Sequence, residues 1–270
     1  MTLLRHRVPA LLAIAVPVGA GMAWMASAGA PGHFALVNAG ALALAVVGIA
    51  LGRGPKLPVV PAILLLILMA FPLVTGPYVS SVTQDAVARW VPLGPITLHA
   101  GMVAIPPLAV LATRERRLGW AMLAAAVAIA LFQPDAASGF ALTFAAVGLH
   151  HVTRDWRMAL VAIGGFVASL VMSVAGEVAP QPFVERVIVD ALGDGIGWAL
   201  MLSGSLAASF LLIVFAAPLE RAERLALAGC LFGFVVMALM STYPTPLVGY
   251  GAAPILGFGL ALGLVRRKAA

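Results

Sequence analysis

The chain has 270 residues, of which 63% are hydrophobic and only 10% are charged, and its formal net charge is +6. Soluble domains are about half apolar and about one quarter charged, so this composition excludes an ordinary soluble enzyme and is typical of a polytopic membrane protein. The positive charge therefore indicates topology and not nucleic-acid binding. The single cysteine, Cys230, excludes an internal disulfide and a cysteine-based metal site, and its apolar surroundings predict buried packing.

About ten apolar runs of membrane-spanning character follow one another along the chain, since a span needs roughly 20 mostly apolar residues. They cover residues 8–28, 33–52, 57–77, 94–112, 117–133, 137–151, 157–176, 194–217, 222–242 and 247–265. Backbone groups cannot remain unpaired in hydrocarbon, and these runs do not alternate as barrel strands do. We therefore predict an all-α fold, with residues 1–270 forming a single transmembrane domain.

The basic residues assign the two sides of the membrane. Of the 16 Lys and Arg residues, all but Arg89 and Arg186 fall in alternate connections or at the termini. By the positive-inside rule, both termini are cytoplasmic and the protein is a multi-pass protein of the cytoplasmic (inner) membrane. The basic start and the small residues at 26–30 also resemble a cleavable secretory signal, but we expect residues 1–28 to remain as the first span, because cleavage would reverse the side of the other basic loops.

The acidic residues divide differently between the two sides. The outer side carries Asp85, Asp135, Glu177, Glu185, Asp190 and Asp194. It also has the two longest loops, at about 78–93 and 177–193, and any active site is expected there. A solvated loop charge is the alternative for each of these acids, and Asp190 and Asp194 also lie near a helix start, where the helix dipole favours acids.

Gln133-Pro134-Asp135 interrupts two strongly apolar runs. Pro134 suits a helix start and Asp135 can serve as the N-cap of the next helix, but the neighbouring amide is not needed for a turn. His150 and His151 have no third ligand nearby in sequence, and His33 and His99 lie beside apolar runs, so a metal site is not expected. No phosphate-binding loop, dinucleotide fingerprint or hydrolase motif is present.

Three segments resemble motifs of the SEDS family (shape, elongation, division and sporulation), the RodA- and FtsW-like membrane glycosyltransferases. DAVARWVPLGPITLHAG at 85–101 resembles an Arg-Trp-x-x-Leu-Gly-Pro segment, FQPDAASGFAL at 132–142 a Gln-Pro-Asp-x-Gly segment, and TPLVGYGAAPILGFGLALGLVRR at 245–267 the family's last helix. The positions that match are Arg89, Trp90, Gly94, Pro95, Gln133, Pro134, Asp135, Pro246, Tyr250 and Gly251. Their order along the chain makes the combination more specific than any one match.

The resemblance implies a peptidoglycan glycosyltransferase that polymerises a lipid-linked disaccharide pyrophosphate at the outer membrane face, in cell-wall synthesis, cell shape or division. It also implies membrane lipids and a single-span transpeptidase as partners, and no nucleic acid. No cofactor is expected, although a divalent cation could accompany the pyrophosphate. The expected substrate-binding residues are Arg89, Trp90, Gln133, Asp135, Arg186 and Tyr250.

The chain also departs from the family pattern. A Glu and a Lys of the first motif are replaced by Met102 and Ile105, and Gly249 and Ala252 replace a Ser and a Gly of the last motif. The loop that carries the family's catalytic Asp is short, and alignment places Arg186 at that position. Glu185, beside it, and Asp190 are the remaining candidates for the catalytic base. Asp135 is expected to be structural or substrate-positioning.

Three hypotheses follow. The first is a polymerase in which Glu185 or Asp190 activates the acceptor hydroxyl and Arg89 and Arg186 lie near the pyrophosphate. The second is a non-catalytic SEDS-like scaffold that binds lipid-linked precursor or a transpeptidase, which the missing Glu, Lys and Asp favour. The third is a lipid-precursor transporter, which requires charged residues such as Asp135 to line a continuous cavity.

Overall fold

The structure, a computed structural model, describes residues 2–94 and 96–266. Pro95, Arg267 and Lys268 lie outside the described residues. Within them the chain forms α1 (Thr2–Ser27), α2 (Gly32–Leu51), α3 (Val59–Ala70), α4 (Pro72–Thr75), α5 (Ala100–Arg114), α6 (Gly119–Phe132), α7 (Ala136–Thr153), α8 (Trp156–Ala175), α9 (Val187–Asp194), α10 (Ile196–Phe215), α11 (Arg221–Met240) and α12 (Ala252–Gly263). Four short strands, β1 (Val79–Ser80), β2 (Ala86–Val87), β3 (Trp90–Leu93) and β4 (Ile96–His99), precede α5.

Each of the ten predicted spans contains one principal helix. Five helices, α1, α2, α8, α10 and α11, are long and apolar enough to cross a membrane by length and composition. The helices α5, α6 and α12 and the α3–α4 segment are shorter apolar helices. The short α4 continues the third predicted span after Phe71, and the short α9 lies in the predicted second outer loop.

The prediction that the fourth span begins at residue 94 was wrong, because residues 96–99 form β4, and the predicted outer loop 78–93 contains three strands that an all-α fold did not include. β1 pairs with β2, and β3 pairs with β4, in two antiparallel hairpins. Val91, Ile96 and Thr97 are β-branched residues that favour strands, and Gly94 in the turn has φ +61°, a backbone conformation that glycine adopts at low cost. The helix therefore begins only at Ala100, which lengthens the predicted first outer loop.

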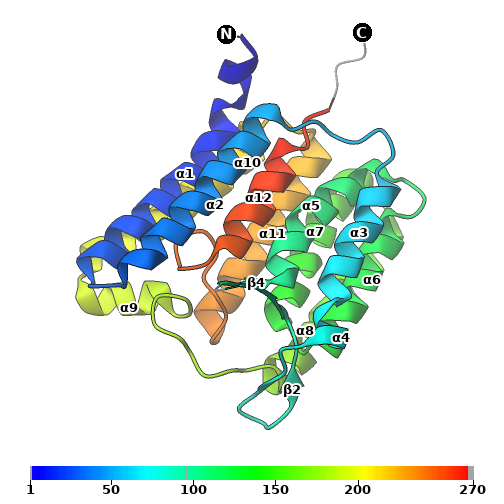
Figure 1. Ribbon diagram of the computed structural model, residues 1–270. Helices are drawn as coiled ribbons and strands as arrows, with labels where there is room; N and C mark the ends of the chain where they lie inside the picture. The colour runs from blue at the N-terminus through cyan, green and yellow to red at the C-terminus, as the bar shows by residue number, and fades with distance from the viewer. Residues whose placement is uncertain (1, 95, 267–270) are drawn as a thin grey trace.

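The helices form a bundle with two distinct ends (Figure 1). At the terminal end, where α1 begins and α12 ends, Gly54 N donates to Val265 O at 2.9 Å. At the opposite end, here called the hairpin end, Val82 N donates to Glu177 O at 2.7 Å and so joins the two predicted outer loops. The connections that were predicted to share a side therefore lie together in space.

A buried acid organises the basic residues of the terminal end. Glu223 Oε1 lies 2.9 Å from Arg114 Nε and 2.9 Å from Arg266 Nε, while Glu220 lies 3.0 Å from Arg266 Nη1. Glu220 and Glu223 also form a capping box at the start of α11. The basic segments that contain Arg114 and Arg266 thus meet at the start of α11, where the helix dipole favours acids.

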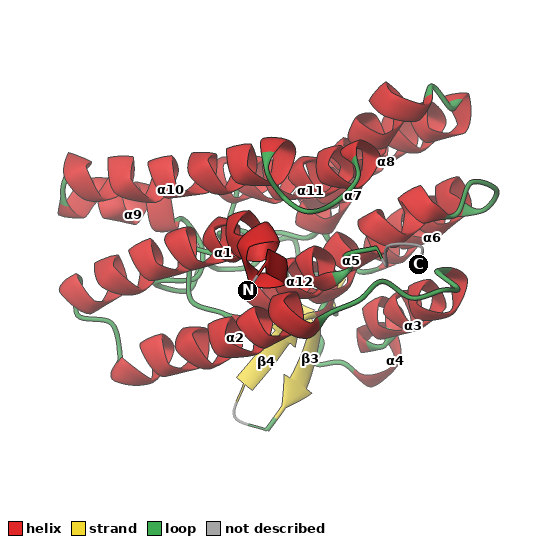
Figure 2. Cartoon of the chain, turned by 90° about the horizontal axis from the view of Figure 1, so that it is seen from above, coloured by secondary structure: helices red, strands yellow, loops and turns green. Residues whose placement is uncertain are grey.

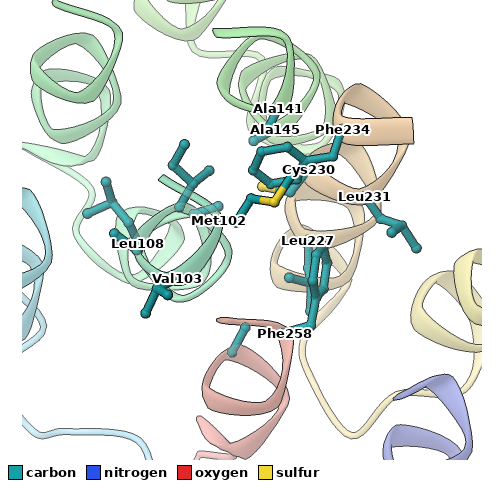
Figure 3. Close-up of a cluster of buried hydrophobic side chains, with 14 of the residues drawn as sticks. Met102, Val103, Leu108, Ala141, Ala145, Leu227, Cys230, Leu231, Phe234 and Phe258 are labelled. Carbon is teal, nitrogen blue, oxygen red and sulfur yellow. The ribbon is translucent and has the colours of Figure 1, made fainter. Parts of the chain in front are cut away.

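The core lies where α5, α7, α11 and α12 meet (Figure 3). Cys230 of α11 is fully buried there, packed among apolar side chains as predicted. Glycines allow the closest approach between α7 and α11, because a Cβ at Gly229 or Gly233 would strike the backbone carbonyl of Phe144 or Phe140. Small residues at helix contacts are the usual means of close packing in membranes. Viewed from above, α6 and α8 lie toward the edge of the bundle (Figure 2).

Candidate functional site

A cavity of about 300 Å³ opens at the hairpin end of the bundle. Its walls come from the β3–β4 hairpin, the loop 176–186, the loop 241–251 and the first turns of α5 and α12. The predicted site residues among its lining are Arg89, Trp90, Glu185 and Tyr250. Arg89 and Trp90 are neighbours in sequence, but Glu185 and Tyr250 come from two other parts of the chain, so only the folded bundle brings the three segments together.

Glu185 is the carboxylate of this cavity. Backbone pairing of Glu185 with Pro244, and the bond from Thr245 N to Val184 O at 2.9 Å, join its loop to the segment before α12. Gln181 N donates to Glu185 Oε2 at 2.7 Å. Burial raises the pKa of the Glu185 carboxyl from 4.5 to about 7, against the opposing effects of the backbone hydrogen bonds and of the Arg89 charge. At neutral pH this group can therefore both accept and release a proton.

Arg89 provides a buried positive charge in the same wall. Its side chain is only 2% exposed and donates from Nη2 to Gly176 O. The guanidinium lies 4.9 Å from the ring centroid of Tyr243 and 5.1 Å from that of Trp90, distances at which aromatic rings stabilise a cation. Arg89 Nε is buried and has no hydrogen-bond partner in the described structure.

Asp135 lies beneath the cavity, is fully buried and does not line it. It is the N-cap of α7, where its Oδ1 accepts from Ser138 N at 3.2 Å, as the sequence predicted. The same Oδ1 lies 3.8 Å from Arg89 Nη1. Its second oxygen, Oδ2, accepts from Ser138 Oγ. Asp135 therefore fixes the position of Arg89 from behind the wall.

Gln133 is also fully buried, and it joins the α6–α7 turn to α3 by donating from Nε2 to Met69 O at 2.6 Å. This bond explains the amide that a turn alone does not require. Gln133 does not line the cavity, so it can influence a ligand there only indirectly, by positioning Asp135 and the α6–α7 turn.

Tyr250 is placed by a second buried amide. Asn38 of α2 donates from Nδ2 to Gly249 O and accepts from Gly251 N, both at 3.0 Å. The Tyr250 ring stacks on Phe34 with centroids 3.7 Å apart, and Tyr250 N donates to Phe183 O at 2.7 Å. The segment before α12 is thereby held between α2 and the Glu185 loop.

Arg186 and Asp190 lie outside the cavity. Arg186 precedes α9 with φ +57° and is exposed, and Asp190 lies on the exposed face of α9. Neither residue lines the cavity. The structure thus brings Glu185, Arg89, Trp90 and Tyr250 together, and it separates Arg186 and Asp190 from them.

Three residues of this region, His99, Asn38 and Tyr243, were not predicted as site residues from the sequence. His99 lines the cavity, but its Nδ1 accepts from Met102 N at 3.3 Å, so the neutral ring carries its proton on Nε2. That nitrogen lies 3.5 Å from Asp135 Oδ2, which makes His99 unsuited to act as a base. Asn38 is a polar residue inside the apolar helix α2, and this feature of the sequence could have identified it as a candidate site residue.

The described residues contain no group of three or more His, Cys, Asp or Glu side chains that could hold a metal ion. Among the cavity residues Glu185 is the single carboxylate. Met102 lines the wall at the position of the SEDS Glu, and Ile105, at the position of the Lys, is fully buried. The described residues therefore do not form a protein cage for a divalent cation.

Comparison with known proteins identifies the fold of this chain but no relative by sequence. No family model and no curated protein matches the sequence. The rod-shape-determining protein RodA of Thermus thermophilus is similar in structure, with a TM-score of 0.65, 18% sequence identity, and coverage of 95% of this chain and 94% of RodA. An Asp-to-Ala mutant of the same RodA gives a TM-score of 0.66 at 18% identity, covering 94% of this chain and 93% of the mutant.

A chain from a structure on the coordination of polymerization and crosslinking by a peptidoglycan synthase complex is also similar. Its TM-score is 0.65 at 19% identity, with 94% of this chain and 95% of that chain covered. The protein therefore has the fold of RodA, a multi-pass membrane fold, over nearly its whole length. The resemblance that three short motifs indicated is confirmed at the level of the fold.

Proposed function

We propose that the protein is a peptidoglycan glycosyltransferase that polymerises a lipid-linked disaccharide at the outer face of the cytoplasmic membrane. The observation that carries this proposal is the cavity at the hairpin end, where Glu185 and Arg89 face a common space within the fold of RodA. The basic terminal end then faces the cytoplasm, in agreement with the positive-inside rule. The cavity consequently opens toward the side on which cell-wall polymers are built.

Glycosyl transfer requires a base at the acceptor and positive charge at the leaving group. The Glu185 carboxylate takes the proton of the acceptor hydroxyl while the hydroxyl oxygen attacks the anomeric carbon of the donor. The bond from that carbon to the pyrophosphate breaks, and the lipid pyrophosphate leaves with the electron pair. Arg89, whose charge is held in place by Asp135, stabilises the negative charge on the departing group.

The roles of the other predicted residues in this proposal depend on how close each lies to the cavity. Trp90 and Tyr250 line the cavity and contact the sugar or the head of the substrate. Gln133 and Asp135 position the wall from beneath. Arg186, exposed next to Glu185 in sequence, meets the pyrophosphate only at the rim of the site. Asp190 is the alternative base, and its exposed position on α9 argues against it.

A polymerisation assay with purified protein and labelled lipid-linked disaccharide tests the proposal. Wild-type protein is expected to make long glycan chains, and Glu185→Gln, which keeps the size of the side chain, is expected to abolish them. Asp190→Asn provides the matched carboxylate change outside the cavity and is expected to remain active. Activity in Glu185→Gln combined with loss in Asp190→Asn would move the base to Asp190, and activity in the double variant would refute both assignments.

The non-catalytic scaffold remains the second candidate because of one observation, that Met102 and Ile105 replace the acidic and basic positions of the SEDS motif in and beside the cavity. In that case the hairpin end binds lipid-linked precursor, and the chain associates with a single-span transpeptidase. Co-purification of such a partner from the native membrane, together with precursor binding but no polymer, would establish the scaffold. Transport is not favoured, because Asp135 is enclosed by its partners and does not line the cavity.

A further inference from the structure

A second hollow lies far from the site, between α6 and α8 at the terminal end of the bundle. Its volume is about 690 Å³. The deeper lining is apolar and includes Val127, Leu160 and Val161. Gly164 also lines it, and a Cβ at this position would meet no other heavy atom within 4 Å. We call this hollow the α6–α8 groove.

The mouth of the α6–α8 groove is cationic and aromatic. Arg117 and Arg157 line it together with Trp120 and Trp156. The Arg157 guanidinium lies 5.8 Å from the Trp120 ring and 5.9 Å from the Trp156 ring. Neither arginine forms an ion pair with any residue in the described ranges. The nearest acids in sequence, Glu115 and Asp155, accept from the backbone N–H of Arg117 and Arg157, which leaves both guanidinium groups free to meet an external anion.

The depth of the groove corresponds to one membrane leaflet. From Trp156 to Gly165 along α8 the helix rises about 14 Å, and half of the hydrocarbon core of a bilayer is about 15 Å. Tryptophan side chains favour the boundary between headgroups and acyl chains, and arginines favour the headgroup layer. Trp156 is 65% exposed and Leu160 is 57% exposed, so the groove faces outward from the bundle.

We propose that the α6–α8 groove is a binding site for an anionic phospholipid of the leaflet at the terminal end. Its phosphate lies between Arg117 and Arg157, and one acyl chain follows the apolar channel past Leu160 and Gly164. Two unpaired cations above an apolar channel complement a lipid that carries a negative headgroup on a hydrocarbon chain. This binding is independent of whether the hairpin end polymerises a substrate.

Native mass spectrometry of the detergent-purified full chain, titrated with phosphatidylglycerol or phosphatidylcholine, tests the site. Wild-type protein is expected to retain one phosphatidylglycerol about tenfold more tightly than phosphatidylcholine, because two cations face the headgroup. Arg117→Gln with Arg157→Gln is expected to remove that preference. Gly164→Leu, whose Cβ would meet no other heavy atom within 4 Å and whose side chain would occupy the channel, is expected to reduce binding of both lipids.

Control variants distinguish lipid binding in the α6–α8 groove from attraction of anionic lipid to the other basic residues at the terminal end. Arg154→Gln with Arg221→Gln removes two exposed charges at the same end outside the groove, and it should keep the preference. Arg117→Lys with Arg157→Lys should also keep it, and thermal unfolding of every variant reports whether it is folded. Equal binding of the two lipids by wild-type protein, or wild-type binding by both the Gln pair and Gly164→Leu, would overturn the proposal. Displacement of the lipid by millimolar inorganic phosphate would indicate a phosphate site without an acyl channel and would overturn it as well.

Discussion

Arg89 Nη1 lies 3.8 Å from Asp135 Oδ1, and both side chains are buried within the hairpin end. Arg89 comes from the loop before β3, and Asp135 is the N-cap of α7. One carboxylate therefore begins a helix and also fixes the cation of the candidate site. The two roles connect the stability of the bundle with the geometry of the cavity.

The first prediction concerns this pair. Asp135→Asn should lower the free energy of unfolding by about 3 kcal/mol, because it leaves the buried Arg89 charge without its partner. Thermal or denaturant unfolding in detergent measures the change, and Asp85→Asn in an exposed loop should have little effect. Adding Arg89→Met to Asp135→Asn should recover part of the loss, whereas strictly additive effects would show that the two residues are not coupled.

The second prediction concerns the pH dependence of activity. A base with a pKa of about 7 is mostly protonated at pH 6 and mostly ionised at pH 8. The rate of polymerisation should therefore rise about tenfold between these pH values. The initial rate of chain formation across this range is the measurement. A flat profile would remove Glu185 from the role of base.

The third prediction uses the same group but needs no activity. The folded-state pKa of Glu185 is raised above 4.5, so between pH 4.5 and about 7 the folded protein holds a proton that the unfolded chain has lost. Stability from this group should thus be highest at low pH and should fall as the pH rises through this window. Unfolding of wild-type and Glu185→Gln protein should diverge in this window alone, since the amide does not titrate. Parallel curves would contradict the raised pKa.

The fourth prediction concerns helix packing. Gly233→Ala should destabilise the protein by about 1–3 kcal/mol, because the added Cβ would strike the backbone of Phe140 and Ala141 in α7. Gly204→Ala in α10 is the matched control, since nothing lies within 4 Å of its added Cβ. There the better helix propensity of alanine should raise stability by about 0.5–1 kcal/mol. Equal effects at the two positions would mean that α7 and α11 are not in close contact.

The fifth prediction tests the orientation in the membrane. Cys230 is fully buried and provides a silent background for thiol labelling. A membrane-impermeant maleimide added to intact cells should label Val82→Cys at the hairpin end, where Val82 is 66% exposed, and should leave Arg154→Cys at the terminal end unlabelled. In permeabilised cells the maleimide should label both variants. Labelling of Arg154→Cys alone in intact cells would reverse the assignment of inside and outside.

Much of the fold followed from the sequence, because each span must satisfy its own backbone hydrogen bonds in hydrocarbon and so depends on local composition. The same holds for the Asp135 cap, whose bond reaches only to Ser138. The β3–β4 hairpin was missed because its strands are short and as apolar as a span. Gly94 and the β-branched residues around it were the signal against a helix there.

The sequence by itself determined the order of the apolar helices, the division of charge between the two ends and the motifs that resemble SEDS proteins. Only the tertiary structure decided that Glu185 shares a cavity with Arg89 whereas Asp190 does not. Residues five apart on a loop and a short helix can face opposite directions, and the burial of Glu185 depends on a segment remote in sequence, here the one that contains Pro244. The pKa of Glu185 and the pairing of Arg89 with Asp135 arise from that burial, so no local pattern could have shown them.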